Sequence, residues 1–344
     1  MNQSKQNKER ERNRRPASDW ELLPPFGTRS IFVVTILFLI MIASGKNTEI
    51  DRMFYLLGEA ASNLVGLRET SQVLDGASRV ADSMFPLQFS ESVETSRIEG
   101  FDPNQLPAFT EIRTENVIRT VIDPQTLKTI ETETTRTILY HPFGYLFRVG
   151  VKMLETLEIA IWATLFSIIL SIPLAYFSAI NFTLNKISYV IARAMVSMFR
   201  AVPELISAMF LVLAFGFGPI AGIMALAIHS AGFLGKFYAE DIENADRGPQ
   251  EALLAVGASK VKILRYAILP QVLPQYVAYN LYILDRNIRM ATVVGIVGAG
   301  GVGQELKGRY DMFEYGHVAT ILLAVFLTVF ILDQISGRIR SKLI

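Results

Sequence analysis

Two long uncharged stretches dominate the C-terminal half of the chain. Residues 159–180 contain no Asp, Glu, Lys or Arg over 22 positions, and residues 205–235 contain none over 31 positions. About 20 helical residues suffice to cross a hydrocarbon core of about 30 Å. The second stretch is too long for one helix, and a Gly-Phe-Gly-Pro sequence at 216–219 provides a turn that divides it. The pattern therefore predicts membrane-spanning helices.

Three more apolar stretches, at 31–45, 272–297 and 317–332, complete a prediction of about six transmembrane helices. The first stretch has the basic start and apolar middle of a signal peptide, but the thirty-residue polar leader before it favours a retained helix. The predicted fold class is thus an all-α polytopic membrane protein, with residues 153–340 as its helical core.

The polar segments predict an orientation. Residues 1–30 are rich in Lys and Arg and are expected to form a cytoplasmic tail, whereas residues 46–152 carry more acidic than basic side chains and are expected outside. Within this external polar segment, residues 91–141 alternate Thr, Val and Ile with charged residues, and this two-residue period predicts a small β-ribbon. Six spans then place both termini and the loop at 239–271 in the cytoplasm.

Composition and motifs exclude several classes of function. The chain of 344 residues is 51% hydrophobic and contains no cysteine, which excludes disulfides and thiol chemistry. His141, His229 and His317 lie far apart and have no carboxylates at metal-ligand spacing. The sequence has no Walker-type phosphate loop and no Gly-x-Ser-x-Gly elbow, so an intramembrane hydrolase is only a weak alternative. We expect no catalytic residue, metal or cofactor on this chain.

Ionisable residues inside predicted spans are costly in a membrane, so they pair with one another or line a polar path. Those in this chain are Arg200, Glu204, His229, Asp285, Arg286 and Arg289. Arg200 and Glu204 are four residues apart and can pair on one helical face. Asp285 and Arg289 can do the same, which leaves Arg286 to face elsewhere. Two interpretations stay open: a solute path with a cationic surplus that suits an anion, or structural ion pairs between helices, with the histidine as an ordinary interior residue.

Four glycines follow the stretch at 272–297, and they are Gly298, Gly300, Gly301 and Gly303. Their Gly-x-Gly-x-x-Gly spacing occurs in dinucleotide-binding folds, but that interpretation needs a soluble strand before the glycines and an acidic residue about twenty positions after them. Here one membrane segment precedes the glycines and another follows. We expect close-packing glycines in a bent turn at the outer face, with a membrane-bound dehydrogenase as the lower alternative.

A polar, helix-forming loop lies between two of the predicted spans. Pro249 suits a first helical turn, and Glu251 is expected near the positive end of that helix. Gly257 can take left-handed dihedrals and end the helix. Ser259 can cap a second helix. The apolar residues expected on one face of that second helix are Val261, Leu264 and Ile268.

This loop resembles the EAA loop of permease subunits of ATP-binding-cassette (ABC) importers, whose pattern is Glu-Ala-Ala, three residues, Gly, then a spacer ending in Ile-x-Leu-Pro. The positions that match are Glu251, Ala252, Gly257, Leu269 and Pro270. Leu253 stands where the second Ala would be, and Ala267 stands where the Ile would be. The resemblance implies that the EAA-type loop (residues 239–271) docks an ATPase, and the orientation above puts it on the side that contains ATP.

Further segments between residues 150 and 340 resemble the phosphonate-transport permease family. They are residues 156–162, 170–174, 216–222, 269–274 and 291–303. The resemblance implies a type I ABC importer permease with a five-helix core after the first helix, located in the bacterial inner membrane. The segment at 91–141 is an insertion relative to the shorter members of the family.

The same resemblance implies partners and cargo. Such permeases are homodimers in the lipid bilayer that associate with two ABC ATPase subunits and receive solute from an external binding protein. ATP and Mg would be bound by the ATPase, and no nucleic acid is implied. The implied cargo is phosphonate or a related phosphorus oxyanion such as phosphite or phosphate. A permease for another solute, such as an amino acid like methionine, is the alternative.

Overall fold

The computed structural model describes residues 27–103, 106–122 and 129–343, and the chain divides after Val80 into two units. The helices of the first unit are α2 (Thr28–Asn47), α3 (Ile50–Leu64) and most of α4 (Gln72–Met84). The apolar side chains of α2 are exposed along its length, as in a helix that faces lipid. The predicted basic tail lies almost wholly outside the described residues.

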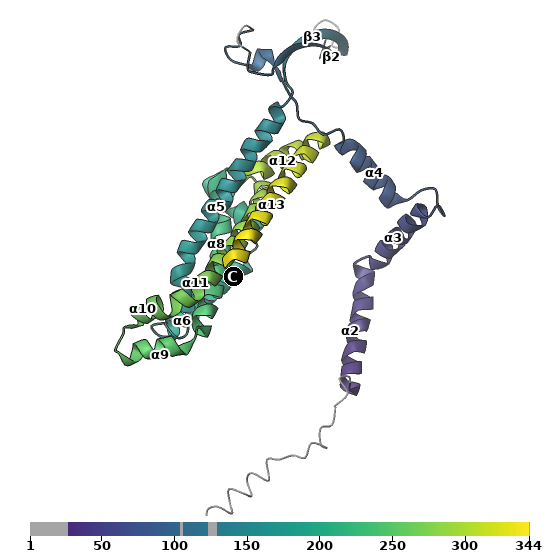
Figure 1. Cartoon of the computed structure of the whole chain (residues 1–344). Coiled ribbons are helices and arrows are strands. Elements are labelled where there is room, and N and C mark those ends of the chain that lie inside the picture. Colours follow the sequence, from purple (N-terminus) through teal and green to yellow (C-terminus); the bar gives the residue numbers. More distant parts are fainter. Residues whose placement is uncertain (1–26, 104–105, 123–128, 344) are drawn as a thin grey trace, which may run out of the picture. The chain divides into compact units, whose positions relative to one another are not determined.

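The second unit is a bundle of helices with a β-ribbon at one end (Figure 1). Its helices are α5 (Gly144–Ser178), α6 (Lys186–Ala201), α7 (Glu204–Phe215), α8 (Pro219–Asn244), α9 (Arg247–Ala255), α10 (Lys260–Ile263), the π-helical turn η3 (Leu264–Ile268), α11 (Leu269–Gly295), α12 (Gly301–Asp311) and α13 (Tyr315–Leu343). The short helices α9 and α10 lie at the end of the bundle opposite the ribbon (Figure 1).

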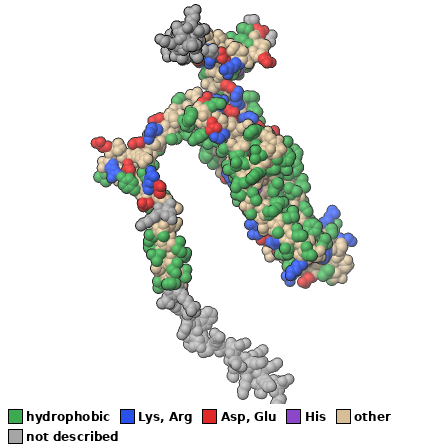
Figure 2. All heavy atoms as spheres, turned by 180° about the vertical axis from the view of Figure 1, so that it is seen from behind, with side chains coloured by type: hydrophobic (Ala, Val, Ile, Leu, Met, Phe, Trp, Pro, Cys, Tyr) green, Lys and Arg blue, Asp and Glu red, His purple; other side chains and the backbone are tan. Residues whose placement is uncertain are grey.

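Small residues form the centre of this bundle. Ala160 and Ala163 of α5 are buried in one cluster with Ala221 and Ala225 of α8. Small side chains let helices approach closely, which is the usual basis of helix packing in membranes, where lipid is as apolar as a protein core. Large apolar side chains instead point outward and cover much of the bundle surface (Figure 2). This distribution fits a bundle surrounded by lipid.

Among the described residues, three helices are long and apolar enough to cross a membrane, namely α5, α8 and α13, and up to five spans result if each of two bent helix pairs counts as one. One of these pairs is α6 and α7, which meet at an angle of 90°. The sequence predicted one span before the turn at 216–219 and no break inside it. The structure breaks this segment at Val202 and Pro203, because Pro203 lacks an N–H and disfavours helical dihedrals at the residue before it.

The ribbon is a three-stranded antiparallel sheet in the order β1-β3-β2. Its strands are β1 (Glu91–Glu94), β2 (Glu111–Ile122) and β3 (Thr129–His141). The long pair β2 and β3 is in register from Glu111 opposite Tyr140 to Ile122 opposite Thr129. Strands therefore form where the sequence alternates with a two-residue period.

The ribbon is joined firmly to the start of α5. The Arg148 guanidinium on α5 pairs with the Glu91 carboxylate on β1. The backbone N–H of Tyr145 donates to the carbonyl of Phe89 at 3.0 Å. These contacts hold the first turns of α5 against the ribbon. The helix therefore begins at Gly144, 15 residues before the uncharged stretch from which the span was predicted.

Arg309 of α12 contacts residues of three segments at the ribbon end of the bundle. It donates to Glu305 at 3.0 Å and to Glu314 at 2.5 Å, and its guanidinium lies 4.9 Å from the centre of the Tyr145 ring. Burial lowers the pKa of Arg309, but the hydrogen bonds to Glu314 and Glu305 outweigh it and leave the pKa raised. The side chain therefore stays charged and links α5, α12 and the start of α13.

Candidate functional site

The first helix of the EAA-type loop, α9, begins at Arg247, so Pro249 lies in its first turn as predicted. Asp246 caps it, because its carboxylate accepts the N–H of Gly248 at 3.1 Å. Glu251 is consequently the fifth residue of α9 and lies in the second turn, so its predicted position near the positive end of the helix is wrong. Its side chain is exposed.

Gly257 ends this helix as predicted. Its φ is +76°, in the left-handed region, and its N–H donates to the carbonyl of Leu254 at 2.9 Å. The N–H of Ala258 donates to the carbonyl of Leu253 at 3.0 Å, which closes the last turn. A β-carbon added at Gly257 would meet no atom within 4 Å. The requirement for glycine is therefore one of backbone conformation and not of space.

The second helix of the loop runs without interruption into the membrane-facing bundle. α10 follows Ser259, whose hydroxyl makes no capping hydrogen bond, and continues through the π turn η3 into α11. Ile263, Ala267 and Ile268 are buried, whereas Val261 is 64% exposed. The predicted face is thus confirmed at Ile268, which is buried, and at Leu264, which packs against the same core cluster, but it is wrong at Val261.

The tip of the loop exposes apolar side chains beside basic ones. Leu254, Val256 and Val261 are among the exposed large hydrophobic residues, and Lys260 and Lys262 are exposed next to them. Blue basic side chains gather at this end of the molecule in Figure 2. Contiguous exposed apolar side chains rimmed by charge are typical of a surface that binds another protein.

The loop is also tied to the first turn of α11. The N–H of Asp246 donates to the Gln271 side chain at 3.0 Å, so the start of α9 is held against the residue that follows Leu269 and Pro270. Pro270 itself lies in the first turn of α11, where its missing N–H costs nothing. A displacement of α9 would therefore be transmitted to α11.

A second group of side chains lies deep in the bundle, where α7, α8 and α11 meet. The Arg286 Nη2 atom on α11 donates to the Glu204 carboxylate on α7, and it lies 3.0 Å from His229 Nε2 on α8. Glu204 is 8% exposed and His229 is 5% exposed. The predicted pair between Arg200 and Glu204 is wrong, because the helix breaks between these two residues and Glu204 faces Arg286 instead.

Arg200 joins this group through an aromatic ring. The guanidinium carbons of Arg200 and Arg286 lie 5.1 and 5.0 Å from the centre of the Phe233 ring. Within the described part of the chain, Arg200 Nε and Arg286 Nη1 are buried atoms with no hydrogen-bond partner. We call these five residues the Arg286 cluster: Arg200, Glu204, His229, Phe233 and Arg286.

Asp285 and Arg289 form the predicted pair four residues apart, at 2.8 Å, and leave Arg286 to other partners as the spacing implied. They lie apart from the cluster's contacts, in a hollow shared with Asp333 and Arg340 of α13. The predicted set of intramembrane charges is therefore divided by the structure between two places on α11.

A buried chain of side-chain hydrogen bonds, which we call the polar ladder, lies beside the cluster and was not predicted from the sequence. Asn287 is fully buried and donates to the Thr164 hydroxyl of α5 at 3.0 Å, while its side-chain oxygen accepts the Ser230 hydroxyl of α8 at 2.9 Å. The ladder links three helices. Its only sequence signal was an amide among the charges of α11, because Thr164 and Ser230 look like ordinary small residues of an apolar helix.

The glycine-rich turn packs closely, and the N–H groups of Gly301 and Val302 are already bonded to side chains of α5. A β-carbon at Gly303 would lie 1.9 Å from the carbonyl oxygen of Thr292. The N–H of Gly301 donates to Glu155 of α5 at 3.0 Å, where a dinucleotide-binding turn would hold phosphate. The turn follows the helix α11 and not a strand. The structural context required for the dehydrogenase alternative is therefore missing from this part of the chain.

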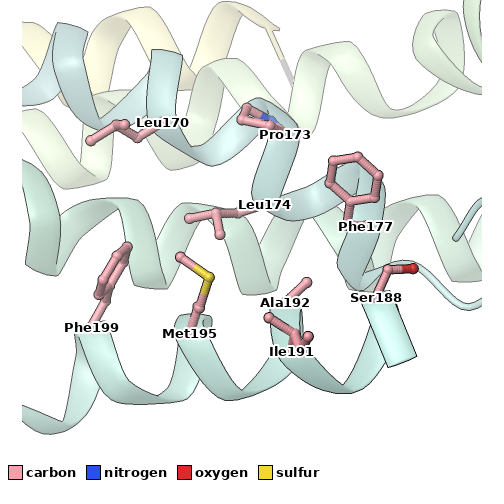
Figure 3. A pocket seen from close by; sticks show the side chains of 9 residues that line it. All are labelled: Leu170, Pro173, Leu174, Phe177, Ser188, Ile191, Ala192, Met195 and Phe199. Atoms are coloured by element: carbon pink, nitrogen blue, oxygen red, sulfur yellow. The ribbon is translucent and has the colours of Figure 1, made fainter. Parts of the chain in front are cut away.

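An apolar groove of about 460 Å³ lies between α5 and α6 (Figure 3). Pro173 and Leu174 of α5 face Met195 and Phe199 of α6 across it. Its lining is apolar except for Ser188, whose hydroxyl donates to the Asn185 carbonyl at 2.9 Å, so the groove offers no charge to an oxyanion. The charged Arg286 cluster is the better candidate for solute contact.

Comparison with known proteins identifies the family. The family described as "Binding-protein-dependent transport system inner membrane component" matches residues 171–344, which is half of the chain. The chain belongs to this family. It is therefore a transport permease of the inner membrane and a nonenzymatic membrane component.

Several relatives of this permease are named for phosphorus compounds. A Stutzerimonas stutzeri protein named as a phosphite transport system permease, HtxE, is 53% identical over 261 residues, which are 76% of this chain and 100% of that protein. The phosphate-import permease protein PhnE of Mycolicibacterium smegmatis is 43% identical over 190 residues, which are 55% of this chain and 36% of that protein.

A solved structure shares the helical fold. The inward-facing MetNI methionine ABC transporter contains a chain that matches with a TM-score of 0.52 and 22% sequence identity, over 58% of this permease and 97% of that chain. At 22% identity this structural similarity shows the fold alone, which is mostly helical and of the ABC importer permease type.

Proposed function

We propose that this chain is the permease subunit of an ABC importer that passes phosphite, phosphonate or phosphate into the cytoplasm, driven by ATP hydrolysis on a separate subunit. The observation that carries the cargo class is the 53% identity to HtxE over the whole length of that protein. Relatives named for phosphate import and phosphonate transport support the same class. The unpaired cationic donors of the Arg286 cluster suit an anion of this kind.

The EAA-type loop is the proposed contact with the ATPase. Its exposed Leu254, Val256 and Val261 offer an apolar surface, and its second helix continues through the π turn into α11. ATP-driven closure of two ATPase subunits would push this loop, and α11 would carry the displacement to Arg286. Two copies of the permease and an external binding protein complete the proposed complex, which alternates between inward- and outward-open states.

The proposed topology has six spans with both termini in the cytoplasm. The absence of cysteine makes a labelling test simple. We expect a cysteine introduced as Ser96→Cys, beside β1, to react with an impermeant maleimide added to intact cells, whereas Ser341→Cys, near the end of α13, reacts only after the cells are opened. The reverse pattern would overturn the orientation and with it the docking role of the loop.

An amino acid such as methionine is the second candidate cargo. The observations that favour it are the MetNI fold and a 28% identity over 172 residues to the methionine import system permease MetP of Bacillus subtilis. Both are weaker than the identity to HtxE, so they support a common fold more than a common cargo.

Copurification and ligand binding test the proposal together. The permease is purified with its ATPase and external binding protein, and the melting temperature of that binding protein is measured with phosphite, methylphosphonate, phosphate or methionine. A ligand at 100 times its Kd stabilises a protein by about 2.7 kcal/mol, which is readily measured. We expect a shift with at least one phosphorus oxyanion. A shift with methionine alone would refute the cargo class.

A further inference from the structure

The Arg286 cluster contains more positive than negative charge. Arg200 and Arg286 each carry one positive charge, and Glu204 supplies the single carboxylate that contacts Arg286. The next carboxylate along α11, Asp285, is paired with Arg289. Unbalanced charge in a buried site is costly, so the cluster is expected to accept an anion.

His229 does not neutralise this charge. Its Nδ1 atom lies 3.0 Å from the Val202 carbonyl, which can only accept, so Nδ1 carries a hydrogen. Its Nε2 atom lies 3.0 Å from Arg286 Nη2 and 3.1 Å from the Glu204 carboxylate, so it can accept from the first or donate to the second. A histidine is neutral or positive in these two cases. The four ionisable side chains of the cluster thus sum to at least one positive charge.

The same cluster contains hydrogen-bond donors that nothing in the described chain satisfies. They are Nη1 of Arg286 and Nε of Arg200, both buried. Buried polar atoms almost always have a partner, so each exception requires an explanation. The two guanidinium groups pack against the same Phe233 ring, so both unsatisfied donors lie in the same part of the bundle.

The backbone at this point is of the kind that forms solute sites in transporters. The α6–α7 pair is bent by 90° at Val202 and Pro203, and Glu204 is the first residue of α7. Discontinuous helices place charged side chains and helix ends next to solute in the middle of a membrane. The cluster therefore joins a helix break to a cationic surplus.

We propose that Arg286 and Arg200 form a transfer site for a phosphorus oxyanion, in which Glu204 is the built-in counter-ion that holds Arg286 while the site is empty. This inference rests on the proposed function. A guanidinium group matches the oxygens of a phosphorus oxyanion. The carboxylate of Glu204 competes with the solute for Arg286, which keeps the binding weak enough for release into the cytoplasm.

Two variants distinguish this site from a structural ion pair. Arg200→Gln removes a cation that is not paired in the structure, so a structural role predicts full transport. The double swap Glu204→Arg with Arg286→Glu keeps one positive and one negative side chain in contact, but it exchanges their positions between α7 and α11. A structural pair tolerates that swap, whereas a transfer site for anions does not.

The measurement uses the complete complex of permease, ATPase and loaded binding protein in proteoliposomes, with phosphite, methylphosphonate and phosphate as probes. Uptake and ATP hydrolysis are both recorded, together with the amount of permease in the membrane. We expect each variant to transport at least about fivefold less oxyanion per ATP hydrolysed. Lys307→Gln, which removes an exposed pair with Asp311 on α12, is the control and keeps the unmodified ratio.

Each result decides the matter. Unmodified transport per ATP in Arg200→Gln would overturn the transfer site, and if the double swap fails to reach the membrane, Arg200→Gln decides alone. Failure of the proposed function looks different, because the unmodified complex would then accumulate none of the three oxyanions. That result would refute both the proposed transport of phosphorus oxyanions and the transfer site that depends on it.

Discussion

The EAA-type loop and the Arg286 cluster hold their charged residues in different ways. The loop is fixed by local contacts: Asp246 caps α9, Gly257 ends it, and most side chains between them are exposed. The cluster is fixed by side chains from four helices whose residues lie up to 86 positions apart, as Arg200 does from Arg286.

This difference has a mechanical consequence. An exposed loop of two short helices can change its partner surface without loss of the fold, whereas a buried polar cluster is rigid only while its members contact one another. The π turn and α11 join the two regions, because Leu264–Ile268 leads into the helix that bears Arg286. Substitutions should therefore separate into those that act on stability and those that act on coupling.

The largest loss of stability is expected for Asn287→Ala, in the ladder beside the cluster. The change removes the acceptor of the Ser230 hydroxyl and the donor to the Thr164 hydroxyl, which keeps its own bond to the Ala160 carbonyl, and it opens a cavity, at a cost of about 2 kcal/mol. We expect a lower melting temperature of the purified permease and less permease in the membrane. Thr164→Val, which removes only one member of the ladder, should cost less. Equal and negligible shifts for both variants would contradict this ranking.

The next effect is expected in the loop, for Gly257→Ala. Its φ of +76° strains a residue with a β-carbon by about 1–2 kcal/mol, although no atom obstructs that carbon. The strain is local, so uptake should fall several-fold at nearly normal abundance. Gly248→Ala is the matched control, since Gly248 lies inside α9 with an ordinary φ and a β-carbon would meet its nearest neighbour at 3.7 Å. Equal uptake by the two variants would show that the turn conformation is unimportant.

These two regions also explain what could be predicted from the sequence. The turn at Gly257 and the strands at 91–141 were predicted because each depends on residues a few positions apart. The partner of Glu204 was not, because helical spacing pointed to Arg200 and only the break at Pro203 turns the carboxylate toward Arg286. Long-range partners require the packing of helices, which spacing alone does not contain.

Two smaller errors lie in the loop itself. In α10, Ile263 is buried and Val261 is exposed, so the predicted apolar face was wrong at its first position. Glu251 was placed one turn too early, because α9 begins at Arg247 after the Asp246 cap and Glu251 is its fifth residue. Such positions decide which side chains a partner can contact.

A smaller effect is expected for Asp246→Ala, which removes the cap of α9. Loss of an N-cap costs about 1 kcal/mol, here through the bond from Gly248 N–H at 3.1 Å. We expect a slightly lower helix content of the loop, detected as faster amide exchange at residues 248–251, with a modest loss of uptake. Asp246→Asn retains a capping oxygen and should behave as the unmodified permease does. Identical exchange in the two variants would show that the cap is dispensable.

The smallest change of stability, with the clearest change of function, is expected for Glu251→Ala. Glu251 is exposed in the second turn of α9, where the helix dipole contributes little and most surface substitutions change stability by less than about 0.5 kcal/mol. The variant should reach the membrane in normal amount. If the carboxylate serves the ATPase contact, the amount of ATPase that copurifies falls and uptake falls with it, whereas a residue that only supports the helix would leave both unchanged. Gln250→Ala is not a suitable control, because Gln250 donates to the Ala245 carbonyl at 3.1 Å, so Lys307→Gln, at an exposed position on α12 outside the loop, is used instead. Normal uptake by Glu251→Ala at normal abundance would remove this carboxylate from the coupling surface and leave Leu254, Val256 and Val261 as the residues to test.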